Sequence, residues 1–487
     1  MSAPHASDRT PLKADIVIIG AGSAGMSAYK AARRFTDSIL VIESGPYGTT
    51  CARVGCMPSK LLIAAAEAAH HARHADRFGI ETGPVTVDGK AVMKRLRAER
   101  DRFVGFVTDD VEGWPEAHKL RGAARFTGPN SLELDDGTRI EAGRIVIATG
   151  SRPAWPAAWN ALGDRLIIND DVFAWDDLPR SVAVFGNGVI GLELAQALHR
   201  LGVRIKLFGL GGLVGPLTDP EIIATARATF AREFDFLPDA QVTSVRREGD
   251  EVIVTEMIDG EPVEERFDYL LAATGRRTNL DQIGLENAGI ALDDRGTPVG
   301  WDRHTARIAD SAIFLAGDAA PDAPLLHEAS DAGRIAGENA ARFPFVAPRH
   351  RRTPIGVVFS DPQIAMMGAT RKALETDNVP FVLGTVDFTG QGRSRVAGRN
   401  VGRLNLYAHA QTGRFLGAEM VGPAAEHIAH LLAWAIEAER TVQQMLDSPF
   451  YHPVIEEGVR TALRAARDAL SPEAIADQPC LDCRTAA

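Results

Sequence analysis

Residues 14–43 read ADIVIIGAGSAGMSAYKAARRFTDSILVIE, and residues 181–209 repeat the same plan as SVAVFGNGVIGLELAQALHRLGVRIKLFG. Each stretch contains an apolar strand pattern, a glycine-rich turn, a helical pattern and a second apolar strand, which together predict a βαβ unit. In a GxGxxG turn the first glycine allows the bend, the second lets a pyrophosphate approach the backbone, and the third lets the helix pack on the strand. These glycines are Gly20, Gly22, Gly25, Gly186, Gly188 and Gly191. The repeat therefore predicts two dinucleotide-binding sites in one chain.

The residue that ends the second strand differs between the two copies. Glu43 and Gly209 stand at the same offset from the first glycine of their turns, close to the roughly 20 residues at which an acid binds the ribose 2′-OH. Glu43 can accept that hydrogen bond, whereas Gly209 cannot. Each unit is followed by an apolar strand that ends in Ala-Thr-Gly, and these turns add to the expected cofactor contacts Thr149, Gly150 and Gly275. Two nucleotide sites indicate electron transfer between two cofactors, as in a flavoprotein reductase.

The composition is that of an ordinary globular protein. The 487 residues carry 53 basic and 64 acidic side chains, for a formal net charge of −11, with 45% hydrophobic and 24% charged residues. This length corresponds to roughly three domains. The net negative charge argues against a chain-wide basic surface for nucleic acid or anionic membrane. No run reaches the roughly 18 apolar residues of a membrane span, and the first residues do not have the pattern of a secretory signal. We therefore expect a cytoplasmic protein without nucleic-acid or membrane partners.

Two of the four cysteines lie close together, in the segment GTTCARVGCMPSKLL at 48–62, directly after the first predicted βαβ unit. Zinc ligands occur more often as CxxC pairs with a second pair elsewhere. Because Cys51 and Cys56 directly follow a flavin-type dinucleotide unit, a redox-active disulfide is the favoured interpretation, with two buried thiols as the alternative. A helix that begins near Cys56 would favour a thiolate there, because the N-terminal end of a helix dipole is positive.

With this cysteine motif, the chain resembles the pyridine nucleotide-disulfide oxidoreductases over residues from about 14 to about 467, and among them most resembles the dihydrolipoamide dehydrogenases. The resemblance implies an α/β fold with two Rossmann-like dinucleotide-binding domains, for FAD and NAD(P), and a C-terminal α+β dimerisation domain. It also implies that Cys51 attacks the substrate disulfide and that Cys56 faces the flavin. Arg53 replaces the asparagine that is usual in the motif, which changes the local charge.

The resemblance gives roles to three further residues near the cofactors. Lys60 is expected to lie near the flavin and to pair with Glu193, whose equivalent in the first repeat is Ser27. The fold itself therefore does not require an acid at that position, although a carboxylate favoured by the helix dipole is the alternative for Glu193. Asp318, in FLAGDAA, is expected to bind a ribityl hydroxyl of FAD, with a surface turn as its alternative. Thr50, beside Cys51, is a further expected cofactor contact.

The C-terminal segment SPFYHPVIEEG at 448–458 matches the HPxxxE motif of the same family. Histidine suits a general base near neutral pH, since its unperturbed pKa is near 6.5, and Glu457 can fix the tautomer and orientation of its imidazole. The resemblance implies that His452 takes a proton from a dithiol substrate, beside Cys51 of the other subunit of a homodimer. A capping or surface histidine is the alternative for an isolated motif.

Gly209 leaves the choice between NAD and NADP open. An acid near this position favours NAD and an arginine favours NADP, but Gly209 offers neither, and Arg204 and Lys206 upstream are expected to be solvated. The overall resemblance favours NAD. The helix after the redox cysteines carries His70, His71 and His74. His70 and His74 are one turn apart, as two zinc ligands could be, but no third ligand is evident. We therefore expect a solvated face and no metal site.

The predicted FAD-binding domain has two parts, at 1–150 and 276–350, and the NAD(P)-binding domain at 151–275 is inserted between them. A dimerisation domain is predicted at 351–470 and a tail at 471–487. We predict that the enzyme oxidises dihydrolipoyl groups through the Cys51–Cys56 disulfide and FAD and reduces NAD+. The dithiol is free or lipoyl-bound, and a 2-oxo acid dehydrogenase complex is a candidate partner, although no docking segment is evident. One alternative is an NADPH-dependent disulfide or metal-ion reductase that uses the CxxC of the tail, Cys480 and Cys483. Another is a flavin- and NAD-binding sensor without turnover.

Overall fold

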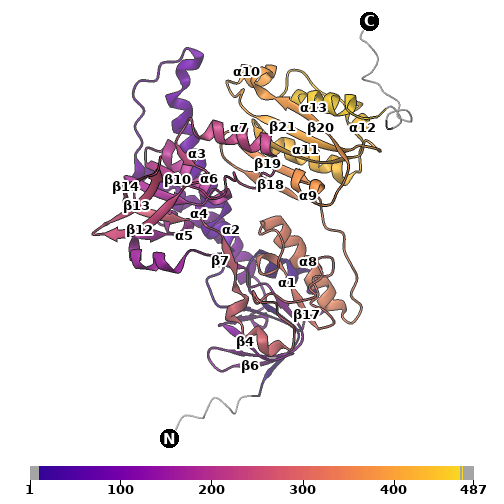
Figure 1. The fold of residues 1–487 in the computed structure, drawn as a ribbon. Coiled ribbons are helices and arrows are strands. Elements are labelled where there is room, and N and C mark those ends of the chain that lie inside the picture. The colour runs from indigo at the N-terminus through magenta and orange to yellow at the C-terminus, as the bar shows by residue number, and fades with distance from the viewer. Residues whose placement is uncertain (1–9, 472–473, 475–487) are drawn as a thin grey trace. The chain divides into compact units, whose positions relative to one another are not determined.

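The computed structural model describes residues 10–471 and 474 (Figure 1). These residues form two compact units, each assembled from three segments of the chain. Among the described residues, unit 1 consists of 10–58, Arg95–Ala154 and Arg276–Arg351, and unit 2 of Ser59–Lys94, Trp155–Gly275 and 352–471 with 474. Within the described part of the chain, no helix combines the length and the apolar character that crossing a membrane requires.

Unit 1 is built on a seven-stranded sheet. Six of its strands have the order β3-β2-β1-β6-β5-β4, and the seventh, β17, pairs with β6. The central strand β1 is parallel to β2 on one side and to β6 on the other, as the first predicted βαβ unit requires. The strands are β1 (Leu12–Ile19), β2 (Ile39–Glu43), β3 (Lys119–Arg121), β4 (Ala124–Gly128), β5 (Ser131–Leu134), β6 (Arg139–Ile147) and β17 (Ile313–Leu315).

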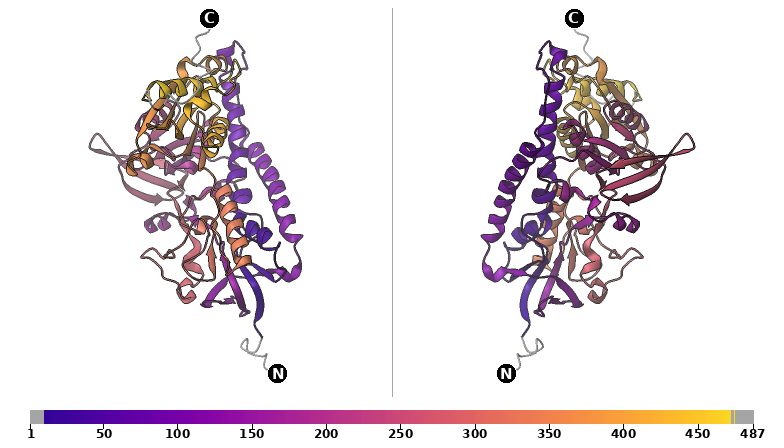
Figure 2. Two further views of the ribbon diagram at one scale, coloured as in Figure 1. Left: turned by 90° about the vertical axis from the view of Figure 1, so that its right-hand side faces the viewer. Right: turned by 90° about the vertical axis from the view of Figure 1, so that its left-hand side faces the viewer.

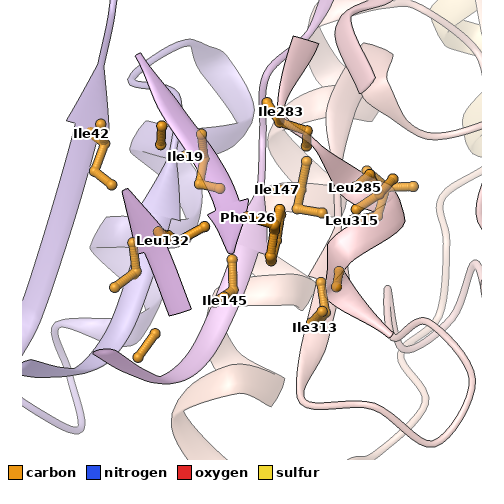
Figure 3. Close-up of a cluster of buried hydrophobic side chains, with 14 of the residues drawn as sticks. Ile19, Ile42, Phe126, Leu132, Ile145, Ile147, Ile283, Leu285, Ile313 and Leu315 are labelled. Carbon is orange, nitrogen blue, oxygen red and sulfur yellow. The ribbon is translucent and has the colours of Figure 1, made fainter. Parts of the chain in front are cut away.

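Both faces of the unit 1 sheet are buried. Because successive side chains of a strand point to opposite faces, Val17 and Ile19 join the hydrophobic cluster of Figure 3, whereas Ile16 and Ile18 pack with α1 (Ser23–Ala32) and α8 (Leu326–Arg342). The two helices approach backbone to backbone, since a Cβ at Gly333 would lie 2.1 Å from the carbonyl oxygen of Ala24. The helix that follows the first glycine turn is therefore packed against both the sheet and α8.

Unit 2 contains the second βαβ unit in a parallel sheet with the order β11-β10-β9-β15-β8. The helix α6 connects β9 to β10, and a three-stranded antiparallel sheet, β12-β13-β14, follows β11 in the chain. The elements are β8 (Leu166–Ile167), β9 (Ser181–Phe185), α6 (Val189–Arg200), β10 (Arg204–Phe208), β11 (Asp235–Leu237), β12 (Val242–Glu248), β13 (Glu251–Ile258), β14 (Glu261–Phe267) and β15 (Tyr269–Ala272).

The C-terminal part of unit 2 is a five-stranded antiparallel sheet with the order β18-β19-β22-β21-β20, packed with α11 (Ala425–Glu437) and α13 (Glu457–Asp468) around one hydrophobic core. Its strands are β18 (Ile355–Val358), β19 (Gln363–Gly368), β20 (Phe381–Asp387), β21 (Arg403–His409) and β22 (Phe415–Gly422). The long helix α3 (Cys56–Arg73) begins within the cysteine segment, and the long helix α4 (Gly89–Glu112) follows it in the chain (Figure 2).

A buried polar cluster joins the nucleotide-binding part of unit 2 to this C-terminal sheet. Asp219 caps α7 (Pro220–Phe230) and accepts a hydrogen bond from the hydroxyl of Tyr407 on β21 at 2.9 Å. Glu419 on β22 accepts a hydrogen bond from the backbone N–H of Asp219 at 3.0 Å. All three residues are 0% exposed. Buried carboxylates are tolerated only when they are hydrogen-bonded, so these contacts tie the two parts of unit 2 together.

Candidate dinucleotide and dithiol sites

In unit 1, the carboxylate of Glu43 is held beside the glycine turn at the end of β2. The backbone N–H of Ala21, inside the turn, donates to Glu43 Oε2 at 2.8 Å, and the N–H of Gly45 donates to Oε1 at 2.8 Å. The carboxyl ends of parallel strands face the crevice in which such folds bind nucleotides. Glu43 is therefore fixed in the place from which it can accept a ribose hydroxyl.

The first glycine turn has room for a diphosphate. A side chain at Gly20 would place its Cβ 2.3 Å from the carbonyl oxygen of Ala148, so that only glycine allows this close crossing. A Cβ at Gly25 would lie 1.8 Å from the carbonyl oxygen of Gly20, whereas one at Gly22 would meet no atom within 4 Å. The open space at Gly22 lies at the N-terminus of α1, which has no acidic residue in its first turn. Such a helix end attracts phosphate through its unpaired N–H groups and its dipole.

Polar groups of unit 1 fit the rest of an FAD molecule. The hydroxyl of Thr149 is buried without a hydrogen-bond partner among the described residues, which is unusual for a native protein and points to a missing ligand atom. The hydroxyl of Ser151 donates to Asp318 Oδ2 at 2.9 Å and accepts from Arg276 Nε at 2.8 Å. The residues present therefore fit FAD.

Ser151 and Arg276 were not predicted from the sequence, although each directly follows one of the two Ala-Thr-Gly turns. Because they hold Asp318 rather than contact a glycine motif, only their positions after Gly150 and Gly275 could have pointed to them. Both of these glycines have positive φ, 68° and 124°, and a Cβ at either would meet no atom within 4 Å. The backbone is thus open at both predicted turns.

In unit 2, the second glycine turn reproduces the geometry of the first. A Cβ at Gly186 would lie 2.2 Å from the carbonyl oxygen of Ala273, one at Gly191 would lie 1.8 Å from the carbonyl oxygen of Gly186, and one at Gly188 would meet no atom within 4 Å. The two repeats therefore form equivalent dinucleotide cradles. The residues of this second turn fit the diphosphate of NAD(P) for the same reasons as those of the first turn fit FAD.

The environment of the second cradle corrects the expectation that Arg204 and Lys206 are both solvated. Lys206 is buried and forms ion pairs with Glu256 and Glu265. Arg204 is half exposed and donates to Glu265 and to the carbonyl oxygen of Arg266. Both cations are thus held by strands β13 and β14 of the three-stranded antiparallel sheet.

The cysteine segment in unit 1 folds as two consecutive helices. Cys51 lies in α2 (Thr50–Val54) and is half-buried, and Cys56 is the first residue of α3 and is exposed. A Cβ at Gly55 would lie 3.1 Å from the carbonyl oxygen of Thr50 and 3.2 Å from Cα of Cys51. The link between the helices therefore turns back tightly against Cys51. The position of Cys56 at a helix N-terminus favours a thiolate.

In unit 2, Lys60 and Glu193 form a bidentate ion pair. Lys60 Nζ lies 2.9 and 2.8 Å from the two carboxylate oxygens of Glu193 and 4.5 Å from the ring centroid of Phe359. Glu193 is 4% exposed and also accepts a hydrogen bond from the backbone N–H of Phe359 at 3.0 Å. Because α6 begins at Val189 and has no acid in its first turn, the dipole alternative does not explain this residue.

The predicted histidine and glutamate of the C-terminal motif are in contact. His452 Nδ1 lies 2.9 Å from Glu457 Oε1, and the hydrogen bond from His452 is the main cause that lowers the pKa of Glu457. The imidazole is 80% exposed. Glu457 begins α13, and residues 451–456 are not helical, so the two residues do not share a helical turn. The glutamate at a helix N-terminus instead orients an imidazole in the preceding loop.

The expectation of a solvated histidine face after the cysteines is wrong for His70. Its Nδ1 lies 3.8 Å from Glu233 Oε1, and burial lowers its pKa to about 4. Within the residues that the structure describes, no group of three or more His, Cys, Asp and Glu side chains is placed to hold a metal ion. Cys480 and Cys483 lie outside the described residues.

Comparisons with known proteins cover almost the whole chain. The family model described as pyridine nucleotide-disulphide oxidoreductase matches residues 14–333, and the dimerisation domain of that family matches 355–463. The chain is 32% identical to the dihydrolipoyl dehydrogenase of Chlamydia pneumoniae, over 91% of this chain and 95% of that protein. It is 33% identical to that of Haloferax volcanii, over 94% of this chain and 96% of that protein.

Two solved structures share the fold. One is the Cu(II) complex of the HOCl-induced flavoprotein disulfide reductase RclA from Escherichia coli, with a TM-score of 0.79 and 22% identity, covering 93% of this chain and 99% of that chain. The other is LpdA from Mycobacterium tuberculosis, with a TM-score of 0.78 and 24% identity, covering 94% of this chain and 100% of that chain.

Proposed function

Because this chain belongs to the pyridine nucleotide-disulphide oxidoreductase family, we propose that it oxidises a dihydrolipoyl dithiol and reduces NAD+. Family membership makes the chain an FAD-dependent enzyme that acts on a sulfur group with NAD(P). The dimerisation domain at 355–463 supports a homodimer. The dihydrolipoyl substrate and the roles of single residues are our inference, supported by relatives that are named dihydrolipoyl dehydrogenases.

The observation that carries this proposal is the tight link between the two cysteine helices, in which Gly55 lies against Cys51 while Cys56 begins α3. In the proposed exchange, one substrate thiolate attacks the sulfur of Cys51 in a Cys51–Cys56 disulfide, and Cys56 leaves as a thiolate. The second substrate thiolate then attacks the substrate's own sulfur and releases Cys51. The substrate becomes a disulfide, the protein becomes a dithiol, and two electrons pass to the protein.

The substrate thiols must lose their protons for this exchange, because the thiolate is the nucleophile. We assign that proton transfer to Nε2 of His452, since Nδ1 is engaged by Glu457 at 2.9 Å. Glu457 keeps the imidazole in one tautomer and stabilises its protonated form. Bound in the first glycine cradle, FAD would supply the two-electron chemistry that links the protein dithiol to NAD+.

Lys60 follows Cys56 by four residues on α3, and its ammonium group is fixed by Glu193 and by the ring of Phe359. We assign to the pair the role of holding Lys60 in one position near the flavin. The cofactor contacts that we assign to FAD are Gly20, Gly22, Gly25, Glu43, Thr50, Thr149, Gly150 and Asp318.

The experiment that tests the proposal is steady-state turnover of the purified protein with dihydrolipoamide and NAD+, followed by NADH formation. Wild type should turn over, and Cys51→Ser should lose all turnover while it keeps its FAD. The matched control is Cys480→Ser/Cys483→Ser, which should turn over like wild type. Absence of turnover in FAD-loaded wild type would overturn the proposal. Loss of turnover in the tail variant would favour a reductase that uses the C-terminal dithiol.

A lipoyl domain of a 2-oxo acid dehydrogenase complex would present this dithiol on a protein. The proposed partner is therefore such a domain. Turnover with a reduced lipoyl domain at a lower KM than with free dihydrolipoamide would support it, and equal or higher KM values would count against it.

A further inference from the structure

The two repeats of this chain use equivalent backbone N–H groups in different ways. In the first repeat the N–H of Gly45, two residues after Glu43, donates to that glutamate at 2.8 Å. The equivalent N–H in the second repeat belongs to Gly211, two residues after Gly209, and it donates to Asp239 Oδ1 at 2.9 Å. A carboxylate thus meets the same loop amide in both repeats, but in the second repeat it comes from a different strand.

The side chain of Asn187 explains why the acid is absent at Gly209. Asn187 stands where the first repeat has Ala21, and its Nδ2 donates to the carbonyl oxygens of Leu213 at 2.6 Å and Pro238 at 3.3 Å. A Cβ at Gly209 would lie 2.6 Å from this Nδ2 and 2.8 Å from the Pro238 oxygen. The amide of Asn187 and the carbonyl oxygen of Pro238 together leave no room for a side chain at position 209.

Asp239 is well placed to replace that acid. The strand β11 runs parallel to β10 in a register that pairs Leu237 with Phe208, so Asp239 lies just beyond the carboxyl end of its strand, beside the loop that starts at Gly209. This is the edge at which nucleotides bind in such sheets. Asp239 is exposed, and among the described residues its carboxylate accepts a hydrogen bond from the Gly211 N–H alone. Its second oxygen remains available for a ligand.

We propose that Asp239 supplies the carboxylate that binds the adenosine ribose of the nicotinamide nucleotide, and that it makes NAD(H) the preferred nucleotide. This inference rests on the proposed NAD+-dependent function. A carboxylate accepts hydrogen bonds from ribose hydroxyls, and it repels the 2′-phosphate that distinguishes NADP(H). In the second repeat the acid therefore follows β11, whereas in the first repeat it stands at the position equivalent to Gly209, which follows β10.

One cation from α7 lies against the same loop and would favour NADP(H) instead. The guanidinium of Arg227 packs against Gly212, since a Cβ there would lie 1.8 Å from Nη2. Arg227 makes no ion pair with any described residue, and its Nε is buried without a hydrogen-bond partner among them. An arginine near this loop could bind a 2′-phosphate. Binding experiments on variants of Asp239 and Arg227 therefore distinguish a preference for NAD(H) from a preference for NADP(H).

The test measures the binding of ADP-ribose and 2′-phospho-ADP-ribose to the FAD-loaded protein by calorimetry. Neither ligand carries a nicotinamide, so binding is measured without turnover and independently of the dithiol substrate. We expect wild type to prefer ADP-ribose. Asp239→Asn should bind ADP-ribose about 10- to 100-fold more weakly, as expected for a lost hydrogen bond to a charged group. The ratio of its affinities for ADP-ribose and 2′-phospho-ADP-ribose should fall or reverse.

Two variants serve as controls. Asp235→Asn removes an exposed acid at the opposite end of the same strand and should bind both ligands like wild type. Asp239→Glu keeps the charge and should retain the preference. The proposal is overturned if Asp239→Asn binds ADP-ribose like wild type, or if wild type prefers 2′-phospho-ADP-ribose and Arg227→Gln removes that preference. These results do not depend on whether dihydrolipoamide is the substrate.

Discussion

The contact between Asn187 and Gly209 can be measured by a double-mutant cycle of Gly209→Ala and Asn187→Ala. A methyl group at position 209 would meet Nδ2 of Asn187 at 2.6 Å and the backbone oxygen of Pro238 at 2.8 Å. Overpacking of this kind destabilises by about 1–3 kcal/mol. Asn187→Ala removes hydrogen bonds of 2.6 and 3.3 Å, which at about 0.5–1.5 kcal/mol each gives a loss of about 1–2 kcal/mol, since the second bond is long.

The two losses should not add. Once the amide of Asn187 is gone, its contacts with the methyl group at position 209 are relieved and the contact with the Pro238 oxygen remains. The double variant should therefore be more stable than the sum of the single effects by at least about 0.5 kcal/mol. Urea unfolding of the FAD-loaded protein, followed by circular dichroism, gives each free energy from the shift of the midpoint.

A matched control is available in the same turn. Gly188→Ala introduces a methyl group that meets no atom within 4 Å at a glycine whose φ is not positive, and it should change the stability by less than about 0.5 kcal/mol. Additivity of Gly209→Ala and Asn187→Ala within about 0.3 kcal/mol would refute the argument that the amide excludes a side chain from position 209.

Three further predictions concern charged and polar groups. Glu457→Gln should lower turnover with dihydrolipoamide at least about 100-fold at unchanged FAD content, because general-base catalysis contributes about 10²–10⁴-fold and depends on the orientation of His452; turnover within threefold of wild type would contradict this role. Tyr407→Phe should destabilise the protein by about 1–3 kcal/mol in urea unfolding, because it removes a donor to two buried carboxylates. Burial raises the pKa of Asp219, but hydrogen bonds from Asn405 and Tyr407 outweigh burial and the pKa is lowered. The stabilisation from these hydrogen bonds is present above the unfolded pKa of 3.8 and disappears as the pH falls through the lower folded pKa. The loss of unfolding free energy in Tyr407→Phe should therefore be equal at pH 8 and pH 5. The imidazole of His70 should titrate near pH 4 by NMR, because burial disfavours its charged form, and a midpoint above 6 would show that it is solvated.

Local sequence patterns predicted the elements that hold the nucleotide sites. The strand, turn and helix periods of both βαβ units are contained within about 30 residues each, and the glycines 20, 25, 186 and 191 have the close backbone crossings that their spacing implies. The pairs Lys60–Glu193 and His452–Glu457 were expected from the family resemblance. Nothing in the periodicity of either segment could have revealed a contact between residues 133 positions apart.

Long-range pairing explains where the sequence interpretation was incomplete. Lys206 was expected to be solvated because its partners, Glu256 and Glu265, lie 50 and 59 residues later on antiparallel strands. Asp239 was overlooked for a similar reason, since its proximity to Gly211 depends on the parallel pairing of β11 with β10. A motif search reads one strand at a time, whereas these groups are brought together by neighbouring strands.

The buried contacts of Asp219, Tyr407 and Glu419 limit how this enzyme could be recombined. Nucleotide-binding segments are often treated as exchangeable modules, but here the segment 155–275 contributes one carboxylate to a cluster whose other members lie on β21 and β22. A chimera that received this segment from a relative without an equivalent acid would leave the buried hydroxyl of Tyr407 without the carboxylate to which it donates. Transplanting cofactor preference between relatives should therefore succeed by exchanging single loops and fail by exchanging the whole segment.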